Sequence, residues 1–171
     1  MSPHNVTAVT TAESSRAPRP VRTAAILWVV AIAAGVFETV LAIVGLLGER
    51  PVPFGELVTG AGVRLVVFVV AGCLVVRLLG GRNWARWALT LLLGMLGGAS
   101  LLIDPVRWLL DGNDLGETLA AFAAADWLFA VSRVVHLGAV VAALVSMFRP
   151  ESNRYLTATT HGEAACGLPR K

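Results

Sequence analysis

Four long apolar segments constrain this chain more than any other feature of its sequence. They cover about residues 24–47, 57–79, 84–103 and 126–148 and contain few ionisable side chains. At a rise of 1.5 Å per residue, about 20 helical residues cross a hydrocarbon layer roughly 30 Å thick. Lipid offers the backbone no hydrogen-bond partners, so a segment that crosses it must be helical. The sequence therefore predicts an all-α membrane protein with a four-transmembrane-helix bundle over residues 24–148.

Composition and charge agree with a membrane protein. Of the 171 residues, 56% are apolar and only 15% are charged, whereas about a quarter are charged in soluble domains. The net charge is +3, but no basic stripe interleaved with aromatic residues is present, as a nucleic-acid surface would require. We expect the lipid bilayer as a partner and no nucleic acid.

Polar segments flank the four spans. Residues 1–23 are rich in Ser, Thr, Pro and Ala, and residues 149–171 are also polar. Few large apolar side chains are available there to drive folding, so we expect both segments to be disordered tails. The first apolar run is about twice too long for a cleaved signal and follows a polar tail, which indicates a membrane anchor.

The distribution of basic residues predicts the orientation. Most of the 14 basic residues lie in the two tails and around the second connection, whereas the opposite side is rich in acids. Basic residues are retained on the cytoplasmic side. We therefore expect a plasma (inner) membrane protein with both termini in the cytoplasm (N-in/C-in). The basic residues that carry this prediction are Arg16, Arg19, Arg22, Arg77, Arg82, Arg86, Arg149, Arg154, Arg170 and Lys171.

The connections carry helix-breaking residues. Residues 80–83 (Gly-Gly-Arg-Asn) predict a tight turn, and the connection over residues 104–125 is longer. Asp114 followed by Glu117 fits a helix-capping pattern, which predicts a short extracytoplasmic helix between spans three and four. That helix either lies at the membrane interface, bending near Asp126, or runs on into the fourth span.

Four ionisable residues lie inside the spans, where charges are costly and usually find partners within the bundle. Their distances from the outer ends of their helices are similar, roughly 10–15 Å, so we expect a polar cluster in the outer half of the bundle. Ion pairing of the glutamate with either arginine is geometrically possible, and Thr39, Ser100 and Ser132 can add hydrogen bonds. The four residues are Glu38, Arg64, Arg133 and His136.

The cluster has two interpretations. It can act as a structural clasp that fixes helix register, or as a binding site for a small solute or anion. Two arginines against one glutamate leave excess positive charge, which favours an anionic ligand. Arg64 has a third possibility, since its long stem allows its head to reach outward to the membrane surface.

No catalytic, cofactor or metal pattern accompanies the cluster. His136 is the only histidine within a span, so we expect no haem or metal site, no cofactor and no enzymatic activity. Gly94 and Gly98 form a GxxxG pattern, which permits close helix approach. We expect it to serve packing within the chain or, alternatively, a homo-oligomer or another protein partner.

Two short segments carry a resemblance. Gly81-Arg82-Asn83-Trp84-Ala85-Arg86 resembles a turn of small actinobacterial integral membrane proteins of unknown function, and residues 148–155 are similar to their C-terminal edge. The resemblance implies a four-helix layout and no activity. Glu38 in the first span resembles the embedded glutamate of small multidrug transporters, but this chain is longer, has Arg133 and His136 in its last span and lacks a matching motif around Glu38.

The leading hypothesis from the sequence is a non-enzymatic membrane protein, an accessory subunit of a membrane complex with an architectural cluster. The alternative is a small-solute or anion transporter or binding protein that uses the same four residues as its site.

Overall fold

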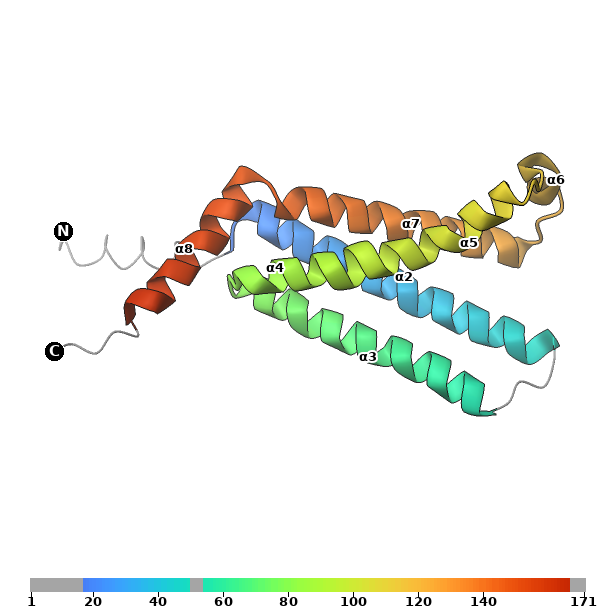
Figure 1. Ribbon diagram of the computed structural model, residues 1–171, viewed down its shortest axis with the longest axis horizontal. Helices are drawn as coiled ribbons and strands as arrows, with labels where there is room; N and C mark the ends of the chain where they lie inside the picture. Colours follow the sequence, from blue (N-terminus) through green and yellow to red (C-terminus); the bar gives the residue numbers. More distant parts are fainter. Residues whose placement is uncertain (1–16, 50–53, 167–171) are drawn as a thin grey trace, which may run out of the picture.

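The structure is a computed structural model that describes residues 17–49 and 54–166. Within these ranges the chain is helical and has no strands, as expected. Figure 1 shows the long helices side by side, with a short helix at one end and a tilted helix at the other. The elements are α2 (Arg19–Glu49), α3 (Phe54–Leu79), α4 (Asn83–Leu89), η1 (Thr90–Gly97), α5 (Gly98–Leu110), α6 (Leu115–Ala120), α7 (Ala124–Met147) and α8 (Pro150–Cys166).

Four helical segments are long and apolar enough to cross a membrane. They cover residues 19–48, 58–79, 83–110 and 124–147, with mean hydropathies of 1.7 to 2.4. Many large apolar side chains point away from the bundle, among them Leu96 at 68% exposure and Val134 at 71%. A water-soluble protein rarely exposes contiguous apolar surface on this scale. The four helices are therefore compatible with an integral membrane protein.

Two spans are longer than the sequence indicated. The first helix begins at Arg19, five residues before the expected start at Ala24, because Pro20 lies in the first turn, where a proline sacrifices no intrahelical hydrogen bond. The third span continues through Pro105 to Leu110 instead of ending near Ile103. Pro105 removes one donor from the helix ladder but does not end the helix.

The short helix between spans three and four is a separate element. The side chain of Asp114 caps α6 by accepting hydrogen bonds from the backbone N–H groups of Gly116 (2.6 Å) and Glu117 (3.1 Å), which confirms the predicted cap. The helix ends at Ala120, and α7 starts at Ala124. The alternative of one continuous helix is therefore wrong.

The expectation of a disordered tail from residue 149 differs from the structure. Residues 150–166 form α8, and Ser152 and Leu156 are completely buried against the bundle. The Ser152 hydroxyl donates to the carbonyl of Ser146 (2.9 Å), and the Tyr155 hydroxyl donates to that of Leu79 (3.3 Å). The mostly polar composition of this segment concealed one face that packs. The disorder expected for residues 1–16 and 167–171 concerns positions outside the described residues.

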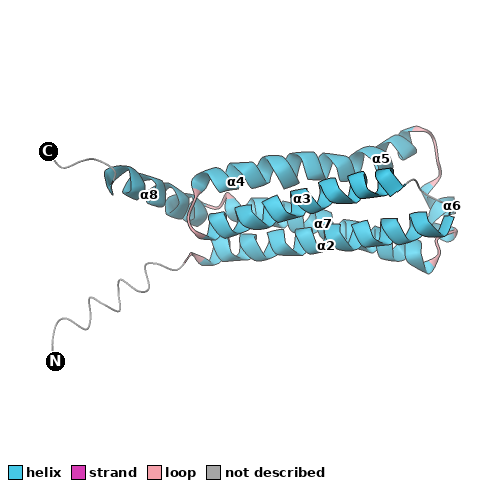
Figure 2. Cartoon of the chain, turned by 90° about the horizontal axis from the view of Figure 1, so that it is seen from below, coloured by secondary structure: helices cyan, strands magenta, loops and turns pink. Residues whose placement is uncertain are grey.

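The bundle is packed tightly at one end only, the end that carries α8 and the start of α2 (Figure 2). Toward the end that carries α6, α3 and α5 diverge (Figure 1). The buried side chains of the core gather at the tight end. The core comprises Val21, Ala24, Ala25, Trp28, Ala31, Ala71, Leu74, Val75, Leu78, Ala85, Leu89, Leu93, Ala139, Val140, Ala143, Met147 and Leu156.

Candidate functional site

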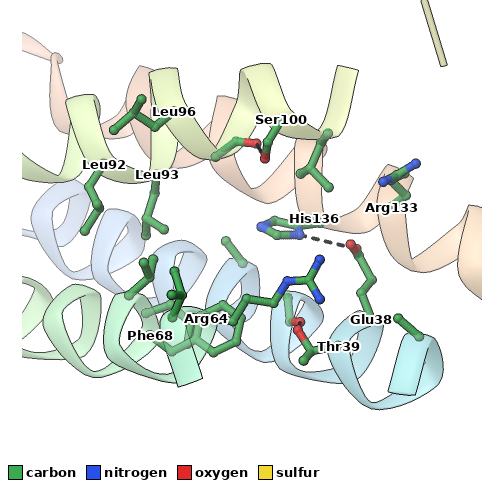
Figure 3. Close-up of a pocket in the computed structure, with 18 of the residues that line it drawn as sticks. Glu38, Thr39, Arg64, Phe68, Leu92, Leu93, Leu96, Ser100, Arg133 and His136 are labelled. Carbon is green, nitrogen blue, oxygen red and sulfur yellow. Dashed lines mark hydrogen bonds and ion pairs between the residues drawn. The ribbon is translucent and has the colours of Figure 1, made fainter. Parts of the chain in front are cut away.

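A cavity of about 470 Å³ lies between the four long helices, beyond the packed core. Its wall includes all four ionisable residues that the sequence placed inside the spans: Glu38 from α2, Arg64 from α3, and Arg133 and His136 from α7 (Figure 3). The structure therefore brings the predicted cluster together around one space. This volume lies in the range of sites that bind small molecules.

Glu38 and His136 are in direct contact across the bundle. His136 Nδ1 lies 3.3 Å from Glu38 Oε1, and both side chains are almost buried, at 13% and 10% exposure. With a proton on Nδ1, the imidazole donates to the carboxylate. The Ser132 hydroxyl donates a longer hydrogen bond of 3.4 Å to the same oxygen. Two helix faces, one on α2 and one on α7, are thus joined through a single carboxylate oxygen.

Neither arginine makes the ion pair with Glu38 that the sequence left possible. Among the described residues, neither Arg64 nor Arg133 has a carboxylate within ion-pair distance, and the carboxylate of Glu38 is engaged by His136 instead. The Arg133 guanidinium lies over the ring of Phe129, one turn away on the same helix, at 5.1 Å from its centre. Its Nε is buried and has no hydrogen-bond partner. An unmet buried donor of this kind costs about 1–3 kcal/mol.

Arg64 lines the cavity from α3. Its guanidinium points into the cavity toward the side where Glu38 and His136 meet (Figure 3). The residue is nevertheless exposed, so the alternative in which its head reaches outward to the membrane surface stays a prediction. The positively charged head at the cavity wall is available to whatever occupies the cavity.

The hydroxyl groups of Thr39 and Ser100 line the cavity, but they are already hydrogen-bonded. Thr39 donates to the carbonyl of Gly35 (2.7 Å), and Ser100 donates to that of Gly97 (2.8 Å), each within its own helix. Of the three hydroxyl residues expected near the cluster, only Ser132 bonds to one of its charged members.

Sequence reasoning missed Asp104 as a cavity residue. We expected it to begin the third connection, but α5 continues past Pro105, which places Asp104 on a helix face at the cavity wall. Its carboxylate and that of Glu38 match the guanidinium groups of Arg64 and Arg133 in number. The excess positive charge inferred from the sequence is therefore offset within the cavity. Asp104 could have been predicted as a cavity residue only if the helix had been expected to continue past Pro105.

Gly35 allows two ring side chains to approach α2 beside the cluster. A methyl group at this position would lie 3.0 Å from Phe68 and 3.2 Å from His136. These distances are tighter than ordinary van der Waals contacts. The absence of a side chain at Gly35 therefore lets His136 reach Glu38 one turn further along α2.

The third span changes its helical form where it lines the cavity. Residues Thr90–Gly97 form the π-helix η1, which contributes Leu92, Leu93 and Leu96 to the wall. Segments of π-helix are rare in proteins, and those that do occur are often found at functional sites.

A methyl group at Gly94 would meet Leu144 of α7 at 3.4 Å, so this glycine of the GxxxG pattern packs within the chain. A role of Gly94 and Gly98 in an oligomer stays a prediction.

Comparison with known proteins adds no relative. No family model, curated protein or solved structure matches this chain. The resemblance of residues 81–86 to actinobacterial membrane proteins therefore stays a prediction.

The cavity offers hydrogen-bond donors and charge, not metal ligands. Across residues 17–49 and 54–166, no group of three or more His, Cys, Asp or Glu side chains could hold a metal ion. The donors without protein acceptors belong to guanidinium groups, whose planar fork matches carboxylates and similar oxyanions.

Proposed function

We propose that this protein is a non-enzymatic, multi-pass plasma-membrane protein that binds a small solute in the cavity between its four long helices. One observation carries the proposal. The ionisable residues of the spans surround an open volume of about 470 Å³, and two of them, Arg64 and Arg133, have no carboxylate partner among the described residues. Charges placed in a membrane interior without partners are costly and mark solute or ion sites.

The architectural alternative accounts for only part of the cluster. The contact of Glu38 with His136 joins α2 to α7 and fits a clasp. A clasp, however, is most favourable when its charges are fully paired and the space between them is filled. The unpartnered Nε of Arg133 and the cavity beside it favour solute binding over a purely structural role or an accessory-subunit role.

Both tails and the turn at Gly81–Arg82 are proposed to face the cytoplasm, since basic residues concentrate there. In this orientation the diverging end of the bundle, with α6, faces the external side. The cavity then lies toward that side, which suits a protein that receives its solute from outside the cell.

Binding can be tested with three ring compounds of similar size and different charge: benzoate, benzylammonium and benzyl alcohol. The temperature of thermal unfolding of the purified protein should rise with increasing concentration of at least one of these compounds and should reach a plateau. Ala42→Phe places a ring in the cavity wall and should abolish the shift, whereas Ala33→Phe on the outward face of α2 should preserve it.

Saturable stabilisation that is lost only in Ala42→Phe supports a site in the cavity. No saturable shift with any of the three compounds, or an identical shift in the two variants, would contradict the proposal. Uptake of the stabilising compound into proteoliposomes then separates a transporter from a binding protein.

A further inference from the structure

The cavity wall changes character along its length. At the end next to the packed core, the lining side chains are apolar: Ile32 on α2, Phe68 on α3, and Leu92 and Leu93 on η1. At the other end the charged residues gather, and Figure 3 shows Phe68, Leu92 and Leu93 on one side of the space and Glu38 and Arg133 on the other. An occupant that satisfies both ends needs one apolar part and one polar part.

The same gradient is present on three helices that run in alternating directions. Along α2 the sequence passes from Ile32 to Glu38, and along α3 it passes in reverse from Phe68 to Arg64. Along the third span it passes from Leu93 to Asp104. Because neighbouring helices are antiparallel, these opposite chain directions place Ile32, Phe68 and Leu93 at one end and Glu38, Arg64 and Asp104 at the other. The charged end also contains apolar residues such as Phe129, so the cavity is apolar at one end and mixed at the other.

At the charged end, the buried polar atom without a hydrogen-bond partner belongs to a cation, Arg133, whereas Asp104 on the same wall is exposed. The Glu38 oxygen that faces α7 is occupied by His136 at 3.3 Å and Ser132 at 3.4 Å. The Arg133 Nε has no acceptor, and the Arg64 guanidinium extends into the space. A planar group with two oxygens and one negative charge matches these donors.

The two acids of the wall restrict how much negative charge the cavity can accept. Glu38 and Asp104 match Arg64 and Arg133 in number, so a bound monoanion adds one uncompensated negative charge, and a dianion adds two. Like charges in a site of low polarity repel strongly. A single carboxylate is favoured over a dicarboxylate.

We infer that the ligand is an amphipathic monoanion, a small organic acid whose carboxylate lies at Arg133 and Arg64 and whose apolar body lies against Phe68, Leu92 and Leu93. This inference rests on the proposed function, because it names the chemical class of solute that the cavity binds. The wall supplies a distinct partner for each half of such a molecule.

The test measures saturable binding of tritiated 3-phenylpropanoate to the purified protein, with three competitors. 3-Phenylpropanamide keeps the body and lacks the charge, acetate keeps the head and lacks the body, and phenylsuccinate carries a second carboxylate. Each should compete at least about 10-fold more weakly than unlabelled 3-phenylpropanoate, a difference that corresponds to one broken interaction at either end. This series uses the unaltered protein.

Matched variants then examine the two ends separately. Arg133→Gln should weaken binding at least about 10-fold, and Arg107→Gln, on an exposed arginine outside the cavity, should not change it. Leu92→Phe narrows the apolar end and should weaken binding of 3-phenylpropanoate, while Leu91→Phe, whose side chain is 56% exposed, should leave it unchanged.

The outcomes distinguish this inference from the proposed function. No saturable binding of 3-phenylpropanoate, equal competition by the amide, acetate or phenylsuccinate, or unchanged affinity in Arg133→Gln would overturn the amphipathic monoanion. If benzylammonium or benzyl alcohol still stabilises the protein in a manner that Ala42→Phe abolishes, the cavity remains a solute site with a different preference. If none of the ring compounds does so, the proposed function fails as well.

Discussion

His136 Nδ1 lies 3.3 Å from Glu38 Oε1, although the two residues are 98 positions apart in the chain. The contact joins the first and the last long helix at the wall of the cavity. Both side chains are almost buried, which shields their hydrogen bond from water. The Ser132 hydroxyl is a second donor to the same oxygen. The pair therefore contributes to the fold and at the same time leaves the neighbouring arginines without this carboxylate.

A double-mutant cycle measures this contact. Glu38→Leu and His136→Leu should each destabilise the protein, and together they should show a coupling energy of about 0.5–2 kcal/mol, the range of interhelical hydrogen bonds in membranes. Reversible unfolding in mixed micelles of increasing SDS content gives the four free energies. As a control, Glu38→Leu with Thr90→Ala should be additive, because Thr90 bonds within its own helix. Additivity of the first pair would contradict the contact.

Gly35 gives a second prediction, since a methyl group there would press on Phe68 and His136 at 3.0 and 3.2 Å. Gly35→Ala should lower the free energy of unfolding by about 1–3 kcal/mol through overpacking. Gly72→Ala, at a site with no atom within 4 Å of the added methyl, should leave it unchanged or raise it by up to about 1 kcal/mol, as alanine favours helix. The same unfolding assay compares them, and equal effects of the two substitutions would contradict the close approach.

The docking of α8 gives a third prediction. Asn153 accepts a hydrogen bond from Arg86, whose guanidinium also lies 4.9 Å from the ring centre of Phe148 and 5.4 Å from that of Trp87. Asn153→Leu removes the acceptor of a buried cation and should weaken docking by about 1.5–3 kcal/mol. Trypsin should then cleave after Arg154 at least about 10-fold faster, because local unfolding exposes the bond.

Glu151→Gln is the control for that experiment, as Glu151 is exposed and lies in the same turn of α8. Its cleavage rate should match that of the unaltered protein. Equal cleavage of all three proteins would mean that the Arg86–Asn153 contact does not hold the helix on the bundle.

The proposed orientation gives a fourth prediction. The test uses a variant in which Cys73 and Cys166 are replaced by serine. In intact cells, Arg82→Cys in this variant should be protected from a membrane-impermeant maleimide, and Glu117→Cys should be labelled. The reason is that the concentration of basic residues assigns the Arg82 turn to the cytoplasm. Permeabilised cells control for reactivity. Labelling of both positions from the same side would contradict a four-span topology, and the reverse pattern would invert the orientation.

The four apolar helices, the tight turn at Gly81 and the cap at Asp114 could be predicted from the sequence. Each depends on interactions between residues close together in the chain, and the apolar runs, the positive φ of Gly81 and the bonds of Asp114 agree with these predictions. The sequence also selected Glu38, Arg64, Arg133 and His136, because charges are conspicuous in apolar segments. Their common cavity was not evident from their spacing alone.

Which charged side chains contact each other depends on how the helices pack in three dimensions. Helical depth made ion pairs of Glu38 with Arg64 or Arg133 equally reasonable, but rotation of each helix about its axis is set by packing across the bundle, and this rotation turned His136 toward Glu38. Packing also placed Asp104 on the cavity wall and folded residues 150–166 against the bundle. These features depend on contacts between distant segments, which hydrophobic periodicity within one segment does not encode.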